Sequence, residues 1–469
     1  MIKQLMRRIF STQYLIKPEK RLGDIPLTKE AYGSSLVIAA PAVAEMVFVT
    51  LIGMADTMMV GVLGNFAIAA VGLTMQPRML FMSLFFALNA GVTAIVSRRK
   101  GAEDRKGANV CLAQSLMLTG ILSVLMAAAA TLLATPAMQL IGAKEDTIVY
   151  ASDYFKIICT WLPVQALTMS INAAQRGIGN TRISLKTSLV SNVVNVIFNY
   201  LLIGGRFGFP RLEVRGAAIA TVIGSAVGLV VAIASLTPKE SYLSFTQIKK
   251  IAPDWPTVQL ISKIGGNAVF EQICMRVGFL LYARVVADLG TFAFSAHQIA
   301  SQMLALTFTI ADGFSVASSS LVGQNLGKKR PDISTIYGKV GQRMAFCISM
   351  LMIGIVLSTR YIFAGFYTRD PQLIQTVANL LVIMTIIQPL QTSHVVMAGS
   401  LRGAGDTRYV AMTMLMTVSV CRPLFSVIMV YGFHLGIEGA WVALILDQGI
   451  RMLLLYRRFN SGRWAAIEI

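Results

Sequence analysis

The stretch QRGIGNTR (Gln175–Arg182) returns almost unchanged as LRGAGDTR (Leu401–Arg408). Each copy follows one long apolar run and precedes another, and the two copies lie 226 positions apart. The same spacing relates further segments: LGNFA (63–67) to LGTFA (289–293), AVAE (42–45) to AVFE (268–271), and Pro163 to Pro389. One ungapped spacing that holds at so many positions predicts an internal duplication.

Apolar segments fill the chain between these motifs. The 469 residues are 55% hydrophobic and 13% charged, which is too little polar surface for a soluble domain of this size. Runs of about 20 apolar residues suit helices that cross a bilayer, whereas the strands of a membrane barrel alternate apolar and polar residues. The runs therefore predict an all-α polytopic membrane protein with twelve transmembrane helices. They cover approximately residues 34–60, 67–97, 108–134, 147–172, 184–204, 216–236, 258–287, 292–322, 335–360, 371–400, 409–432 and 438–456.

The duplication groups the twelve predicted helices into two six-helix lobes, residues 34–236 and 258–456. Residues 237–257 link the lobes, and residues 1–33 and 457–469 form tails. Because six is an even number, both lobes enter the membrane with the same orientation. A pseudo-twofold axis along the membrane normal should then relate them, as in transporters built from parallel repeats. We expect a cavity between the lobes that opens alternately to each side.

Basic residues are distributed unevenly over the predicted loops. Most of the 41 Lys and Arg residues lie in the tails and in or next to alternate loops, which predicts that the linker and both termini are cytoplasmic. Topology and contact with anionic lipid then explain the net charge of +19, and no nucleic-acid partner is expected. Residues 1–33 lack the apolar core of a cleaved signal peptide.

The sequence contains no recognisable catalytic, cofactor or metal-binding motif. Its five Cys are scattered through apolar helices, and no phosphate-binding loop or nucleophile motif occurs. His297 and His394 lie in predicted helices, where they can relay protons or act as structural side chains. We therefore expect no enzyme, no cofactor and no metal, and transport would depend on an ion gradient.

Carboxylates inside the predicted spans are the first candidates for function, because a charge within a bilayer is costly. Asp56 in the first helix can hold a coupling ion, since a carboxyl in a low-dielectric cavity can exchange a proton near neutral pH. Alternatively, Asp56 pairs with an Arg or caps a bend. Glu45 lies about three turns earlier on nearly the same face, where it either joins the ion site or makes a hydrogen bond that packs helices or closes the lobe. Its repeat partner is Glu271, which has Arg276 as a possible ion-pair partner. Asp312 in the eighth helix is a further acid, or simply the partner of an Arg.

Amide side chains form a second group of candidates. Asn195 and Asn199 share one face of the fifth helix with Asn192. Such a stripe either joins helices by hydrogen bonds or contacts a ligand. Gln391 in the tenth helix matches Gln165 at the repeat spacing.

Further motifs stand in a fixed order along the chain. GMADTMMVG (53–61) lies in the first helix, SLVGQNLGKKRP (320–331) follows the eighth, and R-G-x-G-[ND]-T-R follows the fourth and tenth. Together they resemble the multidrug and toxic compound extrusion (MATE) transporters, over roughly residues 34–456. The resemblance implies an inner-membrane antiporter that exports cationic, amphipathic organic compounds against an inward flow of protons or sodium ions. We expect it to work as a monomer in the lipid bilayer.

The resemblance also implies roles for individual residues. Asp56 matches the acidic coupling position in the family's first helix, and Glu271 matches an acidic position that many members use in the second lobe. Asn199 and Gln391 stand where branches of the family have an acid, so the expected coupling rests on Asp56 and Glu271. The helix that carries Asn195 and Asn199 faces the cavity of the amino-terminal lobe.

A related group, the lipid-linked oligosaccharide flippases, gives the main alternative function. Such a protein needs a cationic cavity for pyrophosphate, and four Arg lie within predicted spans: Arg78, Arg276, Arg284 and Arg422. Whether these Arg face a cavity or form ion pairs would discriminate between the two functions. A passive channel fits a duplicated chain less well.

The repeated motif itself suits a helix–turn–helix connection. Its glycines can end one helix, and Asn180 or Asp406 can cap the next. We expect its arginines, Arg176 and Arg402 among them, to reach the lipid headgroups.

Overall fold

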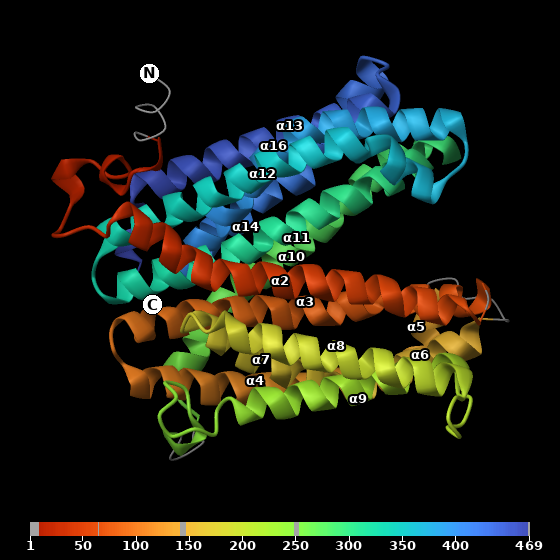
Figure 1. Ribbon diagram of the computed structural model, residues 1–469, viewed down its shortest axis with the longest axis horizontal. Coiled ribbons are helices and arrows are strands. Elements are labelled where there is room, and N and C mark those ends of the chain that lie inside the picture. The colour runs from red at the N-terminus through yellow and green to blue at the C-terminus, as the bar shows by residue number, and fades with distance from the viewer. Residues whose placement is uncertain (1–8, 64, 141–146, 248–252, 468–469) are drawn as a thin grey trace. The chain divides into compact units, whose positions relative to one another are not determined.

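The computed structural model describes residues 9–63, 65–140, 147–247 and 253–467. Within these residues all regular structure is helical, and long helices are joined mostly by short turns (Figure 1). The predicted all-α class is therefore confirmed. Residues 1–8 and 468–469 of the predicted tails and 248–252 of the predicted linker lie outside the described residues.

The helices occupy all twelve predicted segments. In the first repeat they are α2 (Thr28–Gly61), α3 (Asn65–Gly101), α4 (Arg105–Leu132), α5 (Ala134–Leu140), α6 (Ile148–Thr160), α7 (Leu162–Gly177), α8 (Thr181–Gly204) and α9 (Glu213–Ala234). In the second repeat they are α10 (Trp255–Asp288), α11 (Thr291–Gly327), α12 (Pro331–Tyr367), α13 (Pro371–Gly403), α14 (Thr407–Met414), α15 (Arg422–Val427) and α16 (Gly436–Ser461). Among the described residues, ten helices are long and apolar enough to cross a membrane, and the count is eleven if the bent pair α6–α7 forms one span. α10 is not among them, and charged side chains such as Lys263, Glu271 and Arg276 are spread along it.

The fourth predicted span, 147–172, is broken into two helices. α6 ends at Thr160, α7 begins at Leu162, and the two are bent by 48°. Pro163 lies in the first turn of α7, where its missing N–H and bulky ring favour a break in the helix. The repeat-related Pro389 lies inside the continuous helix α13, so the two repeats differ at this point.

Contacts divide the chain into two compact units, which we describe separately. One unit comprises residues 1–43 and 266–469, and the other comprises residues 44–265. The boundaries fall inside α2 and α10, about two to three helical turns beyond the start of each predicted lobe. The lobes expected at 34–236 and 258–456 follow the sequence repeat, whereas the units follow the packing.

Packing explains why the boundaries fall inside these helices. Ile38 and Ala39 in the first half of α2 belong to a hydrophobic cluster with Phe314 of α11. In the other unit, the first half of α10 approaches α3 closely, and Ile264 lies against Gly91. The first part of each helix therefore packs with helices of the other repeat.

The described part of the N-terminal tail is packed against α12. Leu15 and Ile16 are buried in a cluster with Ile336 and Val340. Lys339 Nζ donates a hydrogen bond to the Leu15 carbonyl at 2.8 Å. From the sequence these residues are expected only to form a basic tail, because two apolar residues are too few to predict a docked segment.

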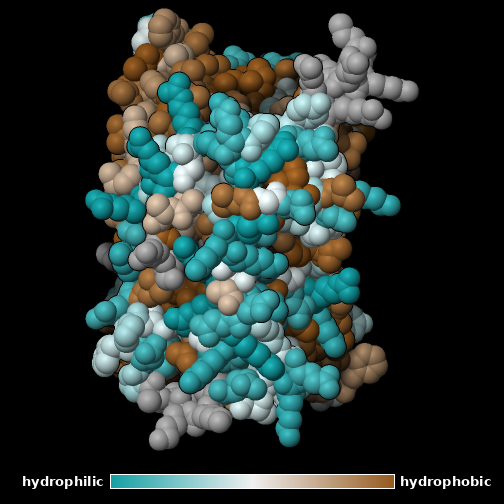
Figure 2. Space-filling model, turned by 90° about the vertical axis from the view of Figure 1, so that its left-hand side faces the viewer, coloured by the Kyte–Doolittle hydropathy of each residue, from teal (hydrophilic) through white to brown (hydrophobic). Residues whose placement is uncertain are grey.

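Hydrophilic side chains cover much of the molecular face shown in Figure 2, and hydrophobic ones lie mainly along its flanks. A hydrophilic face suits contact with water and lipid headgroups, whereas the apolar helix flanks suit the hydrocarbon core.

Candidate functional site

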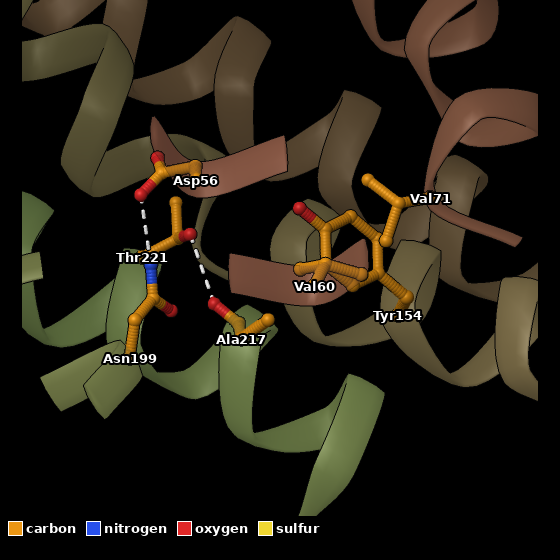
Figure 3. A pocket seen from close by; sticks show the side chains of 7 residues that line it. All are labelled: Asp56, Val60, Val71, Tyr154, Asn199, Ala217 and Thr221. Atoms are coloured by element: carbon orange, nitrogen blue, oxygen red, sulfur yellow. Dashed lines mark hydrogen bonds between the residues drawn. The ribbon is translucent and has the colours of Figure 1, made fainter. Parts of the chain in front are cut away.

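A carboxylate and an amide meet between α2, α8 and α9 (Figure 3), and a second amide on α8 lies beside them. Asn199 Nδ2 donates to Asp56 Oδ1 at 2.8 Å. The Asn195 amide lies one turn earlier on α8. When its nitrogen faces Asp56 and its oxygen faces Thr221, both amide atoms have hydrogen-bond partners. The amide then donates to Asp56 Oδ1 and Oδ2 at 2.8 and 3.1 Å, and its oxygen accepts from the Thr221 backbone N–H at 3.0 Å. The structure thus brings the predicted residues Asp56, Asn195 and Asn199 together.

Two hydrogen bonds hold α2 beside α8 in a fixed register. Ser188 Oγ donates to Glu45 Oε1 at 2.8 Å, and Asn199 donates to Asp56; both pairs are 143 positions apart in the sequence. The two contacts lie eleven residues, about three helical turns, from each other on each helix. A constant separation means that α2 and α8 run in the same direction, so the Glu45 contact helps to position the half of α2 that carries Asp56.

A small cavity of about 50 Å³ opens beside the Asp56 carboxylate. Its lining combines the polar residues Asp56, Asn199 and Thr221 with apolar side chains and Tyr154 (Figure 3). This volume holds a few water molecules or a monatomic cation, whereas drug-sized ligands need several hundred Å³. The oxygen of the Asn199 amide is buried and accepts no hydrogen bond from the described residues. Carboxylate, amide and hydroxyl oxygens are the ligands that hard cations prefer.

The Asp56 carboxylate has amide partners in place of a basic one. Among the described residues, no Lys or Arg nitrogen lies within 4.0 Å of it. Arg78 of α3 is close enough for its charge to act on Asp56, but its guanidinium donates to Gln165 Oε1 at 3.5 Å. Asp56 can therefore accept an exchangeable cation without first breaking an ion pair.

The two repeat-related glutamates pair with the repeated motif. Arg402 forms a hydrogen-bonded ion pair with Glu271, whose side chain is almost completely buried. In the first repeat, Arg176 Nη1 lies 4.0 Å from Glu45 Oε2. The expectation that Arg276 pairs with Glu271 is wrong, because Arg276 is exposed on α10 and Arg402 occupies the carboxylate.

The second repeat contains a fully buried ion cluster that is not among the predicted sites. Arg422 Nε and Nη2 donate to Asp447 Oδ2 at 2.8 and 2.6 Å. Arg451 bonds the other carboxylate oxygen, and its Nε donates to Thr417 Oγ1 at 2.9 Å. All three charged side chains are at most 5% exposed. Two guanidinium groups thus share one carboxylate.

A signal for this cluster was present in the sequence. Asp447 and Arg451 stand four residues apart inside a predicted span, the spacing at which helical side chains meet. The cluster also lies beside an irregular helix, because Arg422 follows the π-helical turns of Leu415–Cys421 and a second such segment spans Ile428–Gly432. π-helical turns are often found at functional sites.

The chain matches a known family along most of its length. A family model described as MatE matches residues 41–201 and again residues 268–428. The chain belongs to the MATE family. The second match, to the other half of the chain, agrees with the duplication, and the resemblance seen in the sequence motifs is confirmed. This MATE protein is therefore a multi-pass membrane transporter.

Curated relatives of this MATE protein cover nearly its whole length. It is 28% identical over 441 residues to the "Probable multidrug resistance protein NorM" of Thermotoga maritima, spanning 91% of this chain and 92% of the relative. It is also 28% identical over 445 residues to the "Multidrug resistance protein PmpM" of Pseudomonas aeruginosa, spanning 91% of each.

Solved structures share the fold of this MATE protein. An outward-facing MATE family transporter of the MOP superfamily matches with a TM-score of 0.85 at 20% identity, covering 92% of this chain and 97% of that one. A MOP superfamily transporter from Pyrococcus furiosus matches with a TM-score of 0.86 at 20% identity, covering 96% and 97%. These likenesses confirm the two-lobe fold.

The remaining predicted residues of the MATE protein lie in the second repeat. Gln391 is buried, and its Oε1 accepts a hydrogen bond from Thr307 at 3.4 Å. Asp312 is half-buried on α11, close enough for its charge to act on Arg402. His297 packs edge-on against Tyr282 and Trp441, as expected of a structural side chain.

His394 is fully enclosed in the second repeat. Its Nε2 lies against Gln448 and is 3.4 Å from Arg451 Nη1. It therefore extends the buried ion cluster, and we assign it no separate role.

The repeated motif has the expected turn but different partners. Gly179 and Gly405 both have φ of 88°, a left-handed conformation that favours glycine. Neither Asn180 nor Asp406 makes the predicted side-chain cap; Asp406 instead accepts from Arg458 Nε at 2.7 Å. The expectation that Arg176 and Arg402 reach headgroups is also wrong, because glutamates of the same unit attract them.

Proposed function

We propose that this MATE protein is an antiporter that exports cationic, amphipathic organic compounds across the cytoplasmic membrane in exchange for protons or sodium ions. The observation that carries the proposal is Asp56, a membrane-embedded carboxylate that faces a small cavity and is held by two amides. The names of the multidrug-resistance relatives support drugs as the exported compounds. The uneven distribution of Lys and Arg supports cytoplasmic termini.

The proposed cycle uses competition for the charge of Asp56. From the outward-facing state, Asp56 takes up a cation, and the neutralised site releases the exported compound. The loaded protein then turns inward, gives up the cation, and binds another compound from the cytoplasm. Asn195 and Asn199 orient the carboxylate and keep its hydrogen bonds satisfied in both states, since an unsatisfied buried polar group is costly. The protein acts as a monomer in this scheme.

Ion pairing argues against the flippase alternative. Arg422 is bound to Asp447, and Arg284 Nη2 lies 3.2 Å from Asp288 Oδ1. A pyrophosphate site needs guanidinium groups that are free to bind the ligand, and these two are already engaged.

A drug-resistance assay in cells that express the protein tests the proposal. Expression in a host without its own efflux pumps should raise resistance to cationic dyes such as ethidium. Asp56→Asn should abolish this resistance while the protein remains in the membrane, and Asn192→Ala should leave it unchanged, because Asn192 donates to the Ser188 carbonyl of its own helix. Assays with and without sodium distinguish the coupling ions. Undiminished resistance in Asp56→Asn cells would contradict the assignment.

A further inference from the structure

Asp56 differs from the buried acids of the second repeat in the groups that neutralise it. Asp56 is held by uncharged amides. In the second repeat, Glu271 is bound by Arg402, and Asp447 is bound by both Arg422 and Arg451. Arginines of the chain therefore neutralise these acids of the second repeat, and Arg176 likewise lies beside Glu45 in the first, whereas Asp56 is left to an external cation.

Burial makes the ion pairs of the second repeat costly to break. Glu271 is 1% exposed and Asp447 is not exposed at all. An entering proton or sodium ion would have to displace a guanidinium that is tethered to the same chain and would then itself be left buried without a partner. Breaking a buried ion pair in this way is strongly unfavourable.

Position 391 also provides no free carboxylate for a cation in the second repeat. Gln391 is an uncharged amide that is hydrogen-bonded to Thr307, so this position contributes no negative charge. Asp312 lies within the influence of Arg402. Of the acids buried in the second repeat, Glu271 and Asp447 both carry an arginine as their ion-pair partner.

We propose that the second repeat holds no exchangeable ion and that each transport cycle carries a single cation, through Asp56. Arg402, Arg422 and Arg451 act as built-in replacements for a second coupling ion. The inference rests on the proposed antiport. Its consequence is electrical: exchange of one proton or sodium ion for one monovalent compound moves no net charge.

Voltage dependence tests the inference. The purified full chain is reconstituted into proteoliposomes with a fixed ion gradient, and a potassium diffusion potential sets the membrane voltage. The probe is ethidium, a permanent monovalent cation. Single-ion coupling predicts that the steady-state ethidium ratio across the membrane is the same at zero and at about 100 mV. Two-ion coupling moves one net charge and predicts a change of about 50-fold in that ratio, which would overturn the inference.

A double substitution supplies a second, independent measurement. Glu271→Gln with Arg402→Gln removes both charges of one pair, so that neither member is left as an unpaired charge. The inference predicts that this variant keeps the same ion dependence and the same voltage independence as the unchanged protein. Loss of one transported ion in the variant would contradict it. If neither protein moves ethidium along the ion gradient, the proposed antiport itself is wrong, a result distinct from voltage-dependent transport.

Discussion

Asp447→Asn should destabilise the protein more than any substitution at a surface ion pair. The substitution removes the one negative charge that two guanidinium groups share and leaves both buried, each at 5% side-chain exposure. Removing one partner of a buried ion pair costs about 3–5 kcal/mol. Because a tenfold change in an equilibrium corresponds to about 1.4 kcal/mol, the folded population should fall by a factor of about 10² to 10⁴ relative to the unfolded one.

Asp153→Asn is the matched control. Asp153 also binds an arginine through short contacts, with Arg215 Nε at 2.9 Å. That arginine is 62% exposed and Asp153 is 27% exposed, so water replaces the lost interaction. Exposed pairs contribute about 0–1 kcal/mol.

Unfolding by SDS in detergent micelles, followed by Trp fluorescence, compares the two free energies of unfolding. The apolar triple variant, Arg422→Met with Asp447→Leu and Arg451→Met, should recover most of the stability lost in Asp447→Asn, because it leaves no buried charge. Equal losses in Asp447→Asn and Asp153→Asn would refute the reasoning.

Three further predictions concern other parts of the molecule. Asn199→Ala should lower ethidium efflux about tenfold or more, because a hydrogen bond to a charged group contributes about 1.5–3 kcal/mol; efflux equal to that of Asn192→Ala would count against the bond to Asp56. Gly403→Ala should reduce the yield of folded protein in size-exclusion chromatography, since its Cβ would lie 2.1 Å from the Ser319 carbonyl oxygen, whereas Gly266→Ala, with nothing within 4 Å, should be tolerated. Leu15→Asp should release the N-terminal tail from α12 and speed its cleavage in limited proteolysis, because Leu15 is only 2% exposed; unchanged cleavage would contradict the docking.

Local patterns in the sequence predict the features that depend on residues close together in the chain: the helices, the residues that share a helix face, and the turns. Continuous apolar runs predicted the helices, since a helix is the way to satisfy the backbone of a single apolar segment in lipid. Helical spacing placed Asn195 and Asn199 on one face, and the structure puts both on Asp56. The positive φ at Gly179 and Gly405 follows from the motif itself.

Partners distant in the sequence could not be predicted in this way. Arg402 is 131 positions from Glu271, and Arg276, which is near in sequence, was the wrong choice because it lies on an exposed face of α10. The break at Trp161 cannot be predicted from Pro163 alone, since the repeat-related Pro389 lies in a continuous helix. A proline limits the local backbone, but tertiary packing decides whether the helix bends.

The central claim is that Asp56 couples ion movement to export, and the reverse reaction tests it most directly. Proteoliposomes are loaded with ethidium in the absence of an ion gradient, and the entry of protons or ²²Na⁺ is followed as ethidium leaves. The unchanged protein should take up one of these ions in step with ethidium loss, and Asp56→Asn should take up none. Ion uptake in Asp56→Asn equal to that of the unchanged protein would contradict the account.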